Sequence, residues 1–198
     1  RNTDSTLRVL REWDVPLPDI LMTSVGTEIY YGNGMVRDEA WRRHIDYRWE
    51  PARLRTAMQS FGGLKLQPPE EQRDFKISYF LESGKFPSRR EVVRRLRKSD
   101  LHANVIYSHK AYLDLLPIRA SKGLALHHIG MRWGLPPERF LVAGDSGNDE
   151  EMLSGNTLGV VVGNHSAELE RLRGQERIFF ADGHYARGMA EGADHYHF

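Results

Sequence analysis

Short apolar runs alternate with amphipathic segments from residue 121 to the end of the chain. An apolar run of roughly four to eight residues is typical of a buried strand, and apolar positions three and four residues apart are typical of a helix. Strands that alternate with helices predict a parallel sheet covered by helices. The expected strands are 140–143, 158–162 and 178–181, and the expected helices are 121–133, one from about 149, 166–173 and 185–192.

Residues before 121 follow a different pattern, in which strands and helices mix without regular alternation. Helices are expected at 1–13, at 41–61 with a break at 49–51, and at 89–98, and strands at 20–31, 75–81, 104–108 and 113–116. The stretch 39–112 has antiparallel character and is expected to be an inserted domain. The sequence therefore predicts an α/β fold: a doubly wound, Rossmann-like parallel-sheet core formed by 1–38 and 113–198, and an inserted α+β cap domain at 39–112.

Composition and charge exclude several classes of protein. The 198 residues are 40% hydrophobic and 28% charged, with a formal net charge of +1, which is ordinary for a soluble globular protein. The balanced charge gives no support for binding to nucleic acid or to a membrane, and no apolar run approaches the roughly 20 residues of a membrane span. The chain has no cysteine, which excludes disulfides and thiol chemistry and fits a cytoplasmic location.

An acidic loop follows the expected strand at 140–143. Its sequence is Gly144-Asp145-Ser146-Gly147-Asn148-Asp149. Ligands of open α/β sheets bind at the carboxyl ends of the strands, and carboxylates crowded there repel each other unless a cation lies between them. Mg²⁺, a hard cation that prefers oxygen ligands, is the natural neutraliser. The alternative is a loop whose Asp or Asn caps the next helix.

A second candidate is Lys122, between Ser121 and Gly123 at the start of an expected helix. Ser121 can cap this helix, and a helix N-terminus favours an anion. A lysine there can hold a phosphoryl oxygen and offset its charge during transfer. A solvated lysine in the first turn is the alternative, although the acidic loop that follows favours a lysine that contacts phosphate.

Together these residues resemble the haloacid dehalogenase superfamily of phosphatases, whose third motif Lys122 matches and whose fourth, acidic motif 144–149 matches. Further segments resemble sucrose-6-phosphate phosphatases, and equally the phosphatase-like C-terminal domain of sucrose-phosphate synthases. These segments are Thr-Ser-Val-Gly-Thr-Glu-Ile-Tyr at 23–30, Lys-Ile-Ser-Tyr at 76–79, Val-Ile-Tyr-Ser at 105–108 and Leu-Asp-Leu-Leu-Pro at 113–117. The resemblance covers almost the whole chain.

The resemblance implies a Mg²⁺-dependent phosphatase. In that family an aspartate of the first motif attacks phosphorus, and a second aspartate protonates the leaving sugar oxygen. Asp145 would be the direct Mg²⁺ ligand here. Asp149 and Asn148 would hold Asp145, Lys122 or a metal-bound water in place.

The resemblance also implies that the cap grips a sugar phosphate and closes over it. The expected sugar contacts are Glu28, Lys76, Ser108, His109 and Asp114. One departure from the family pattern is Tyr112, at a position where related enzymes often carry an acid.

The first motif of the family, Asp-x-Asp, is absent from these 198 residues, and Arg1 corresponds to the last residue of the second motif. Either the chain is a fragment of a longer protein or its domain has lost catalysis. We favour the fragment, because a decayed site would be free to lose the fourth motif and Lys122. The fragment alone is then expected to be inactive, and a sheet without its central strand is expected to expose an unpaired edge.

Three hypotheses follow. The first is a sugar-phosphate phosphatase, most specifically one for sucrose 6-phosphate. The second is a regulatory or bifunctional phosphatase-like domain, linked covalently to a glycosyltransferase domain that makes sucrose phosphate. The third is a module that binds phosphosugars without turnover. An Asp-x-Asp upstream in the reading frame favours the first, and a neighbouring glycosyltransferase region favours the second.

Overall fold

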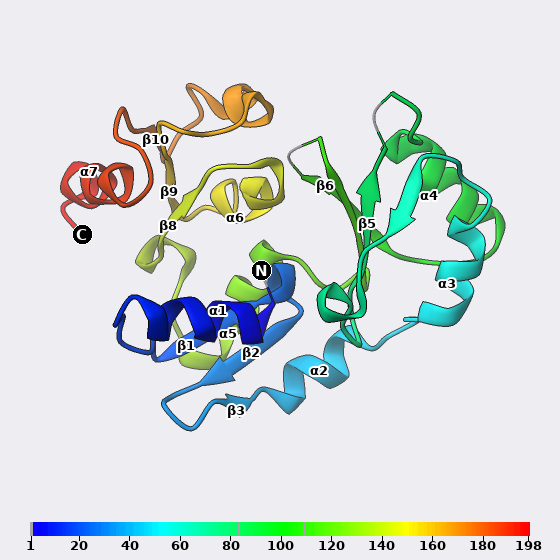
Figure 1. The fold of residues 1–198 in the computed structure, drawn as a ribbon. Coiled ribbons are helices and arrows are strands. Elements are labelled where there is room, and N and C mark those ends of the chain that lie inside the picture. The colour runs from blue at the N-terminus through cyan, green and yellow to red at the C-terminus, as the bar shows by residue number, and fades with distance from the viewer. Residues whose placement is uncertain (1, 83, 109) are drawn as a thin grey trace. The chain divides into compact units, whose positions relative to one another are not determined.

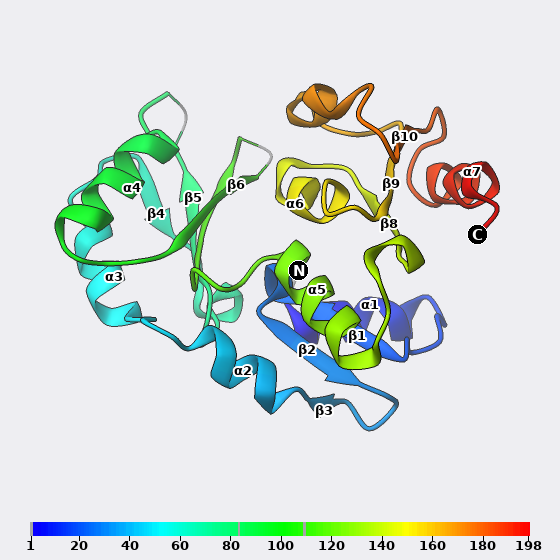
Figure 2. The same ribbon diagram turned by 180° about the vertical axis from the view of Figure 1, so that it is seen from behind.

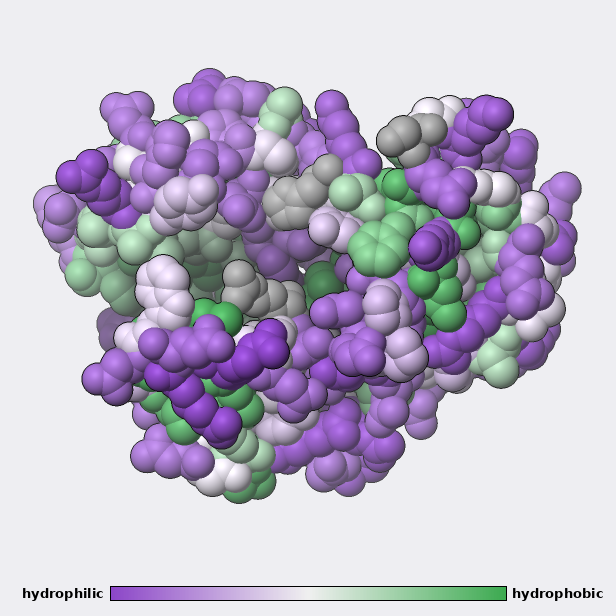
Figure 3. Space-filling model, in the orientation of Figure 1, coloured by the Kyte–Doolittle hydropathy of each residue, from purple (hydrophilic) through white to green (hydrophobic). Residues whose placement is uncertain are grey.

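The structure is a computed structural model that describes residues 2–82, 84–108 and 110–198 (Figure 1). The chain divides into two compact units, Arg1–Ser121 and Lys122–Phe198. Among the described residues, no helix has the length and apolarity that crossing a membrane requires. Hydrophilic side chains cover most of the face in Figure 3, and apolar residues are exposed there in smaller groups, as is normal for a folded protein surface.

Unit 1 begins with helix α1 and a small antiparallel sheet. Helix α1 (Thr3–Glu12) starts at Asn2, whose side chain accepts a hydrogen bond from the backbone N–H of Ser5 at 2.8 Å. Strands β1 (Ile20–Thr23), β2 (Glu28–Tyr31) and β3 (Val36–Arg37) then pair in the order β1-β2-β3. The tight turn η1 (Ser24–Gly26) separates β1 from β2, so the single strand expected at 20–31 is in fact a hairpin.

A larger antiparallel sheet forms the rest of unit 1. Strands β4 (Leu64–Leu66), β5 (Ile77–Leu81), β6 (Asn104–Ser108) and β7 (Tyr112–Leu116) pair in the order β4-β5-β7-β6. Helix α2 (Glu39–Ile45), helix α3 (Pro51–Met58), the short η2 (Pro69–Glu71) and helix α4 (Arg89–Lys98) connect them. Helices α3 and α4 lie on one face of this sheet, where α4 packs against β6 (Figures 1 and 2). The side chains of Leu54 and Met58 in α3, of Val92 and Leu96 in α4, and of Ile77 and Leu115 in the sheet are buried.

Unit 2 contains a parallel sheet in the order β10-β9-β8, formed by β8 (Leu141–Gly144), β9 (Leu158–Val161) and β10 (Ile178–Phe180). Around it lie α5 (Lys122–Trp133), η3 (Pro137–Arg139), η4 (Gly147–Asp149), α6 (Glu150–Leu153), η5 (Ala167–Leu172) and α7 (Ala186–Tyr196). Val161 packs with Leu153 of α6, whereas Val160 and Val162 pack on the other face of β9, toward Tyr196 of α7. Side chains of one strand thus face helices on both sides of the sheet.

The predicted α/β fold with a parallel sheet and antiparallel strands is confirmed. The break expected at 49–51 separates α2 from α3, and the helix expected at 121–133 is α5. Besides the hairpin at 20–31, other details were wrong or missing: 166–173 forms a 3₁₀ segment, the last helix runs to Tyr196, and strands β3 and β4 were not foreseen. The division into a doubly wound core (1–38, 113–198) and an inserted cap (39–112) stays a prediction, while β7 extends the larger antiparallel sheet to Leu116.

Candidate active site

The acidic loop of unit 2 lies directly between strand β8 and helix α6. Strand β8 ends at Gly144, and η4 then leads from Gly147 into α6 at Glu150. Gly144 has no room for a side chain, because a Cβ there would lie 2.4 Å from the Cβ of Asp149. Only glycine lets the strand pass this close to Asp149, so the motif holds Asp149 against the end of the sheet.

Asp149 is the residue that joins the parts of this site. Its side chain is buried, and one carboxylate oxygen, Oδ1, lies 2.5 Å from Nζ of Lys122. The other oxygen, Oδ2, accepts the backbone N–H groups of Asp145 at 3.1 Å and Ser146 at 3.2 Å. Both oxygens therefore have partners, and Asp149 is a positioning group for the loop and for the lysine.

Lys122 is the first residue of α5, and its ammonium also donates to Oδ1 of Asn148 at 2.7 Å. The hydroxyl of Ser146 donates to the same oxygen at 3.2 Å. Helices α5 and α6 touch here, since a Cβ on Gly123 would lie 2.9 Å from Cγ of Glu151. The structure thus brings together Lys122, Asn148 and Asp149, and their roles in a reaction stay a prediction.

Asp145 differs from Asp149 in that its carboxylate is uncommitted. Its backbone N–H is bound by Asp149 and its carbonyl accepts the N–H of Ser166 at 2.7 Å, which fixes the main chain. Within the part of the chain that the structure describes, the half-buried side chain of Asp145 forms no hydrogen bond or ion pair. A rigid backbone with a free carboxylate is suited to a cation ligand.

These residues could hold Mg²⁺, with one carboxylate of this chain as its direct ligand. Across residues 2–82, 84–108 and 110–198, no group of three or more His, Cys, Asp or Glu side chains could hold a metal ion. Mg²⁺ is commonly held by one or two carboxylates, with waters and substrate phosphate completing its shell. One free carboxylate at the end of β8, beside a lysine suited to phosphate, matches that mode of binding.

Two residues that hold the acidic loop were missed by sequence reasoning. Glu168 accepts the backbone N–H of Gly147 at 3.1 Å, and a Cβ on Gly147 would lie 2.5 Å from the same carboxylate. Ser166, which binds the carbonyl of Asp145, has a buried hydroxyl without a hydrogen-bond partner among the described residues. Both lie at η5, about 20 residues beyond the motif, and no local spacing marks them.

Three of the expected sugar contacts lie in or beside the larger antiparallel sheet of unit 1. Asp114 on β7 faces Ser78 on β5, and the serine hydroxyl donates to Oδ1 of Asp114 at 2.5 Å. Lys76 lies two positions before Ser78 and is buried, and Ser108 pairs with Tyr112 at the end of β6. Since side chains two positions apart share a face of a strand, Lys76, Ser78 and Asp114 lie on one side of the sheet.

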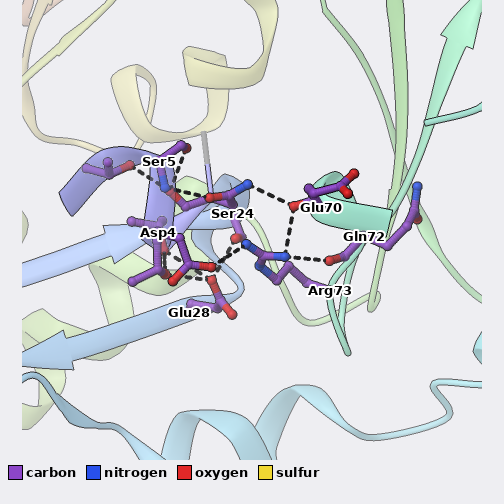
Figure 4. A network of polar contacts seen from close by, with 11 residues as sticks. Asp4, Ser5, Ser24, Glu28, Glu70, Gln72 and Arg73 are labelled. Atoms are coloured by element: carbon purple, nitrogen blue, oxygen red, sulfur yellow. Dashed lines mark hydrogen bonds and ion pairs between the residues drawn. The ribbon is translucent and has the colours of Figure 1, made fainter. Parts of the chain in front are cut away.

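Two further expected contacts have a different outcome. His109 lies outside the described residues. Glu28 is buried, and its Oε2 accepts hydroxyls from Thr3 at 2.8 Å, Thr23 at 3.2 Å and Ser24 at 2.7 Å (Figure 4). Its role as a sugar contact stays a prediction, while the geometry gives it a structural one.

That structural role concerns a strained turn. Ser24 and Val25 have φ values of 52° and 60°, a left-handed conformation that is costly for a β-branched residue. Such residues each cost about 1–3 kcal/mol and persist only where their surroundings hold them. The carboxylate of Glu28 binds the turn at Ser24 and the first residue of α1, Thr3, at one oxygen.

Comparison with known proteins identifies relatives of this chain. A family profile described as sucrose-6F-phosphate phosphohydrolase matches residues 1–197. "Probable sucrose-phosphatase 2" of Arabidopsis thaliana is 35% identical over 189 residues, which are 90% of this chain and 45% of that protein. The "Mannosylfructose-phosphate phosphatase" of Agrobacterium fabrum is 30% identical over 198 residues, covering 99% of this chain and 80% of that protein. The chain thus spans less than half the length of the plant relatives that it matches.

A solved structure resembles the whole chain. The sucrose-phosphatase of Synechocystis, in complex with sucrose and phosphate, superposes with a TM-score of 0.93 at 30% identity, covering 100% of this chain and 82% of that one. Together with the family profile, this confirms the resemblance drawn from Lys122 and the acidic loop. The chain belongs to the sucrose-6F-phosphate phosphohydrolase family of the haloacid dehalogenase superfamily.

Proposed function

We propose that this chain carries the Mg²⁺-binding and phosphate-binding part of a sugar-phosphate phosphatase whose substrate is sucrose 6-phosphate. The observation that carries the proposal is the group of Lys122, Asn148 and Asp149 beside the uncommitted carboxylate of Asp145. Family membership supports it, as do relatives named for phosphatases of sucrose and mannosylfructose phosphates.

In the proposed reaction, a carboxylate of the first motif attacks phosphorus, the bond from phosphorus to the sugar oxygen breaks, and a second acid protonates that oxygen. Water then hydrolyses the phosphoaspartyl group to release phosphate. Neither aspartate is among these 198 residues, which contain no Asp-x-Asp. We therefore expect no turnover by the 198 residues alone.

The residues of this chain supply charge and position. Mg²⁺, held by Asp145, would neutralise the phosphoryl oxygens. Lys122 would donate a charge-assisted hydrogen bond to a phosphoryl oxygen, which strengthens as negative charge develops there. Asp149 and Asn148 both accept hydrogen bonds from the ammonium of Lys122, and these bonds direct the side chain.

Sugar recognition is assigned to Glu28, Lys76, Ser108, His109 and Asp114. The Ser78–Asp114 hydrogen bond supports part of this assignment, because it directs a buried carboxylate on the polar face of the sheet. A carboxylate held in this way can accept two sugar hydroxyls.

The test is phosphate release from sucrose 6-phosphate with Mg²⁺, by the intact protein that contains these residues. Asp145→Ala should abolish release, and Asp194→Ala, which removes an exposed carboxylate from α7, should leave it unchanged. Mannosylfructose phosphate, assayed in parallel, reports on the sugar. No release by an intact protein that still binds sucrose 6-phosphate would refute the phosphatase and favour a regulatory domain attached to a glycosyltransferase.

A further inference from the structure

Unit 1 contains a cavity of about 710 Å³ that is lined by Glu28, one of the expected sugar contacts, and by several residues to which the proposed reaction gives no role. Four arginines from separate segments line it: Arg37 of β3, Arg42 of α2, Arg55 of α3 and Arg73, which follows η2. Ligand sites for small molecules have volumes of roughly 300–1,000 Å³ and a few convergent polar groups. Four cations that converge on one cavity predict an anionic ligand.

The arginines are weakly neutralised by the protein itself. Arg42 is 4.0 Å from Glu39 and Arg73 is 3.0 Å from Asp4, but Glu39 and Asp4 are largely exposed, so water screens both pairs. Arg37 and Arg55 form no ion pair with any described residue. These ion pairs thus neutralise the positive charge of the four arginines only in part.

Two of the four side chains are already held in place. Figure 4 shows Arg73 between Asp4 and the carbonyls of Glu70 and Gln72, to which its guanidinium donates at 2.9 and 2.8 Å. The guanidinium of Arg42 lies over the ring of Phe75, 5.8 Å from its centre. A fixed guanidinium loses little entropy on binding an oxyanion, and its planar fork fits a phosphate.

The cavity also contains acids, which decide the class of ligand. Glu28, Asp46 and Asp74 line it. One oxygen of Glu28 already accepts hydroxyls of the protein, whereas within the described ranges the carboxylates of Asp46 and Asp74 form no hydrogen bond or ion pair. Trp49 fixes the main chain beside one of them, through a 2.7 Å hydrogen bond from Nε1 to the carbonyl of Asp74. Carboxylates repel a ligand that is anionic throughout, but they accept hydroxyl protons well.

We propose that this cavity is a second binding site, for a small sugar phosphate whose phosphate meets the arginines and whose hydroxyls meet Asp46 and Asp74. The site goes beyond the proposed phosphatase activity, because none of its four arginines or two aspartates has a role in the reaction. The bound ligand would connect the three-stranded sheet, through Arg37, with helices α2 and α3, and would favour the arrangement in which these segments converge.

The test is isothermal titration calorimetry with glucose 6-phosphate. The intact protein should carry Lys122→Ala and Asp145→Ala, which remove phosphate binding at the acidic loop. We expect one binding event to remain in this background. Arg42→Gln with Arg55→Gln should weaken it about tenfold or more, because each loses a charge-assisted hydrogen bond. The matched control is Arg43→Gln with Arg53→Gln, which removes exposed arginines from the same two helices and should leave the affinity unchanged.

Two comparisons complete the test. Inorganic phosphate and glucose should each bind about tenfold or more weakly than glucose 6-phosphate, since each uses only part of the site. Circular dichroism and the melting temperature verify that the variants fold. Loss of all binding in the Lys122→Ala, Asp145→Ala background would overturn the second site. Equal affinity for glucose 6-phosphate in the Arg42→Gln, Arg55→Gln variant and in its control would overturn it too. Because no turnover is measured, failure of the phosphatase proposal would leave this result unaffected.

Discussion

The ion pair between Lys122 and Asp149 joins helix α5 to the acidic loop, and replacing the lysine tests how much it contributes. Lys122→Met keeps the length of the side chain but removes the ammonium 2.5 Å from Asp149, whose side chain is only 6% exposed. Breaking a fully buried pair costs about 3–5 kcal/mol. Because Lys122 is 29% exposed and Asp149 keeps two backbone N–H partners, we expect a smaller loss in the free energy of unfolding, about 2 kcal/mol.

The measurement is urea-induced unfolding of the intact protein at neutral pH, followed by circular dichroism. Lys98→Met is the control, because it removes a lysine from the exposed end of α4 and should change the free energy of unfolding by less than about 0.5 kcal/mol. Adding Asp149→Asn to Lys122→Met should cost less than the sum of the two single changes, because the stranded charge is then removed. A loss below about 0.5 kcal/mol for Lys122→Met would show that the pair behaves as an exposed one, and would refute the positioning argument.

Three further predictions concern packing, recognition and pH. Gly144→Ala places a Cβ 2.4 Å from that of Asp149, and displacing the acidic group should lower phosphate release by the intact protein about a hundredfold; unchanged activity would contradict the proposed site. Ser78→Ala removes the 2.5 Å hydrogen bond to Asp114 and should raise KM for the sugar phosphate about tenfold with little change in kcat, whereas a matching fall in kcat would argue against a role in sugar binding. Burial, and to a lesser extent the nearby carboxylate of Glu91, raises the pKa of Tyr107 from 10.0 to about 12. The folded state then holds the hydroxyl proton of Tyr107 more tightly than the unfolded state does. This difference stabilises the folded protein fully below pH 10, and the stabilisation is lost as the pH rises to about 12. In Tyr107→Phe the free energy of unfolding, measured by urea titration, should fall less over that pH range than in the unchanged protein. The same pH dependence in both proteins would show that Tyr107 does not cause the fall.

Much of the fold follows from local patterns in the chain. The alternation of apolar runs and helical segments after residue 121 predicts the parallel sheet, because each signal spans only a few neighbouring residues. Strand order in unit 1 does not follow in this way. Strand β7 inserts between β5 and β6, and β4 pairs only at the edge, because pairing is chosen by the burial of side chains distant in sequence.

For the candidate site, too, some features follow from the local sequence and others only from the tertiary structure. The sequence by itself determined that Lys122 and the loop 144–149 belong to one phosphatase motif set, since residue type and order within each motif are local properties. Only the tertiary structure decided that both carboxylate oxygens of Asp149 accept hydrogen bonds from the protein, whereas the carboxylate of Asp145 accepts none from the described residues. It alone placed the hydroxyls of three residues on one oxygen of Glu28, and four arginines around one cavity. Such groupings join residues from separate segments, and they form because packing brings those segments together, which no periodicity within a single segment encodes.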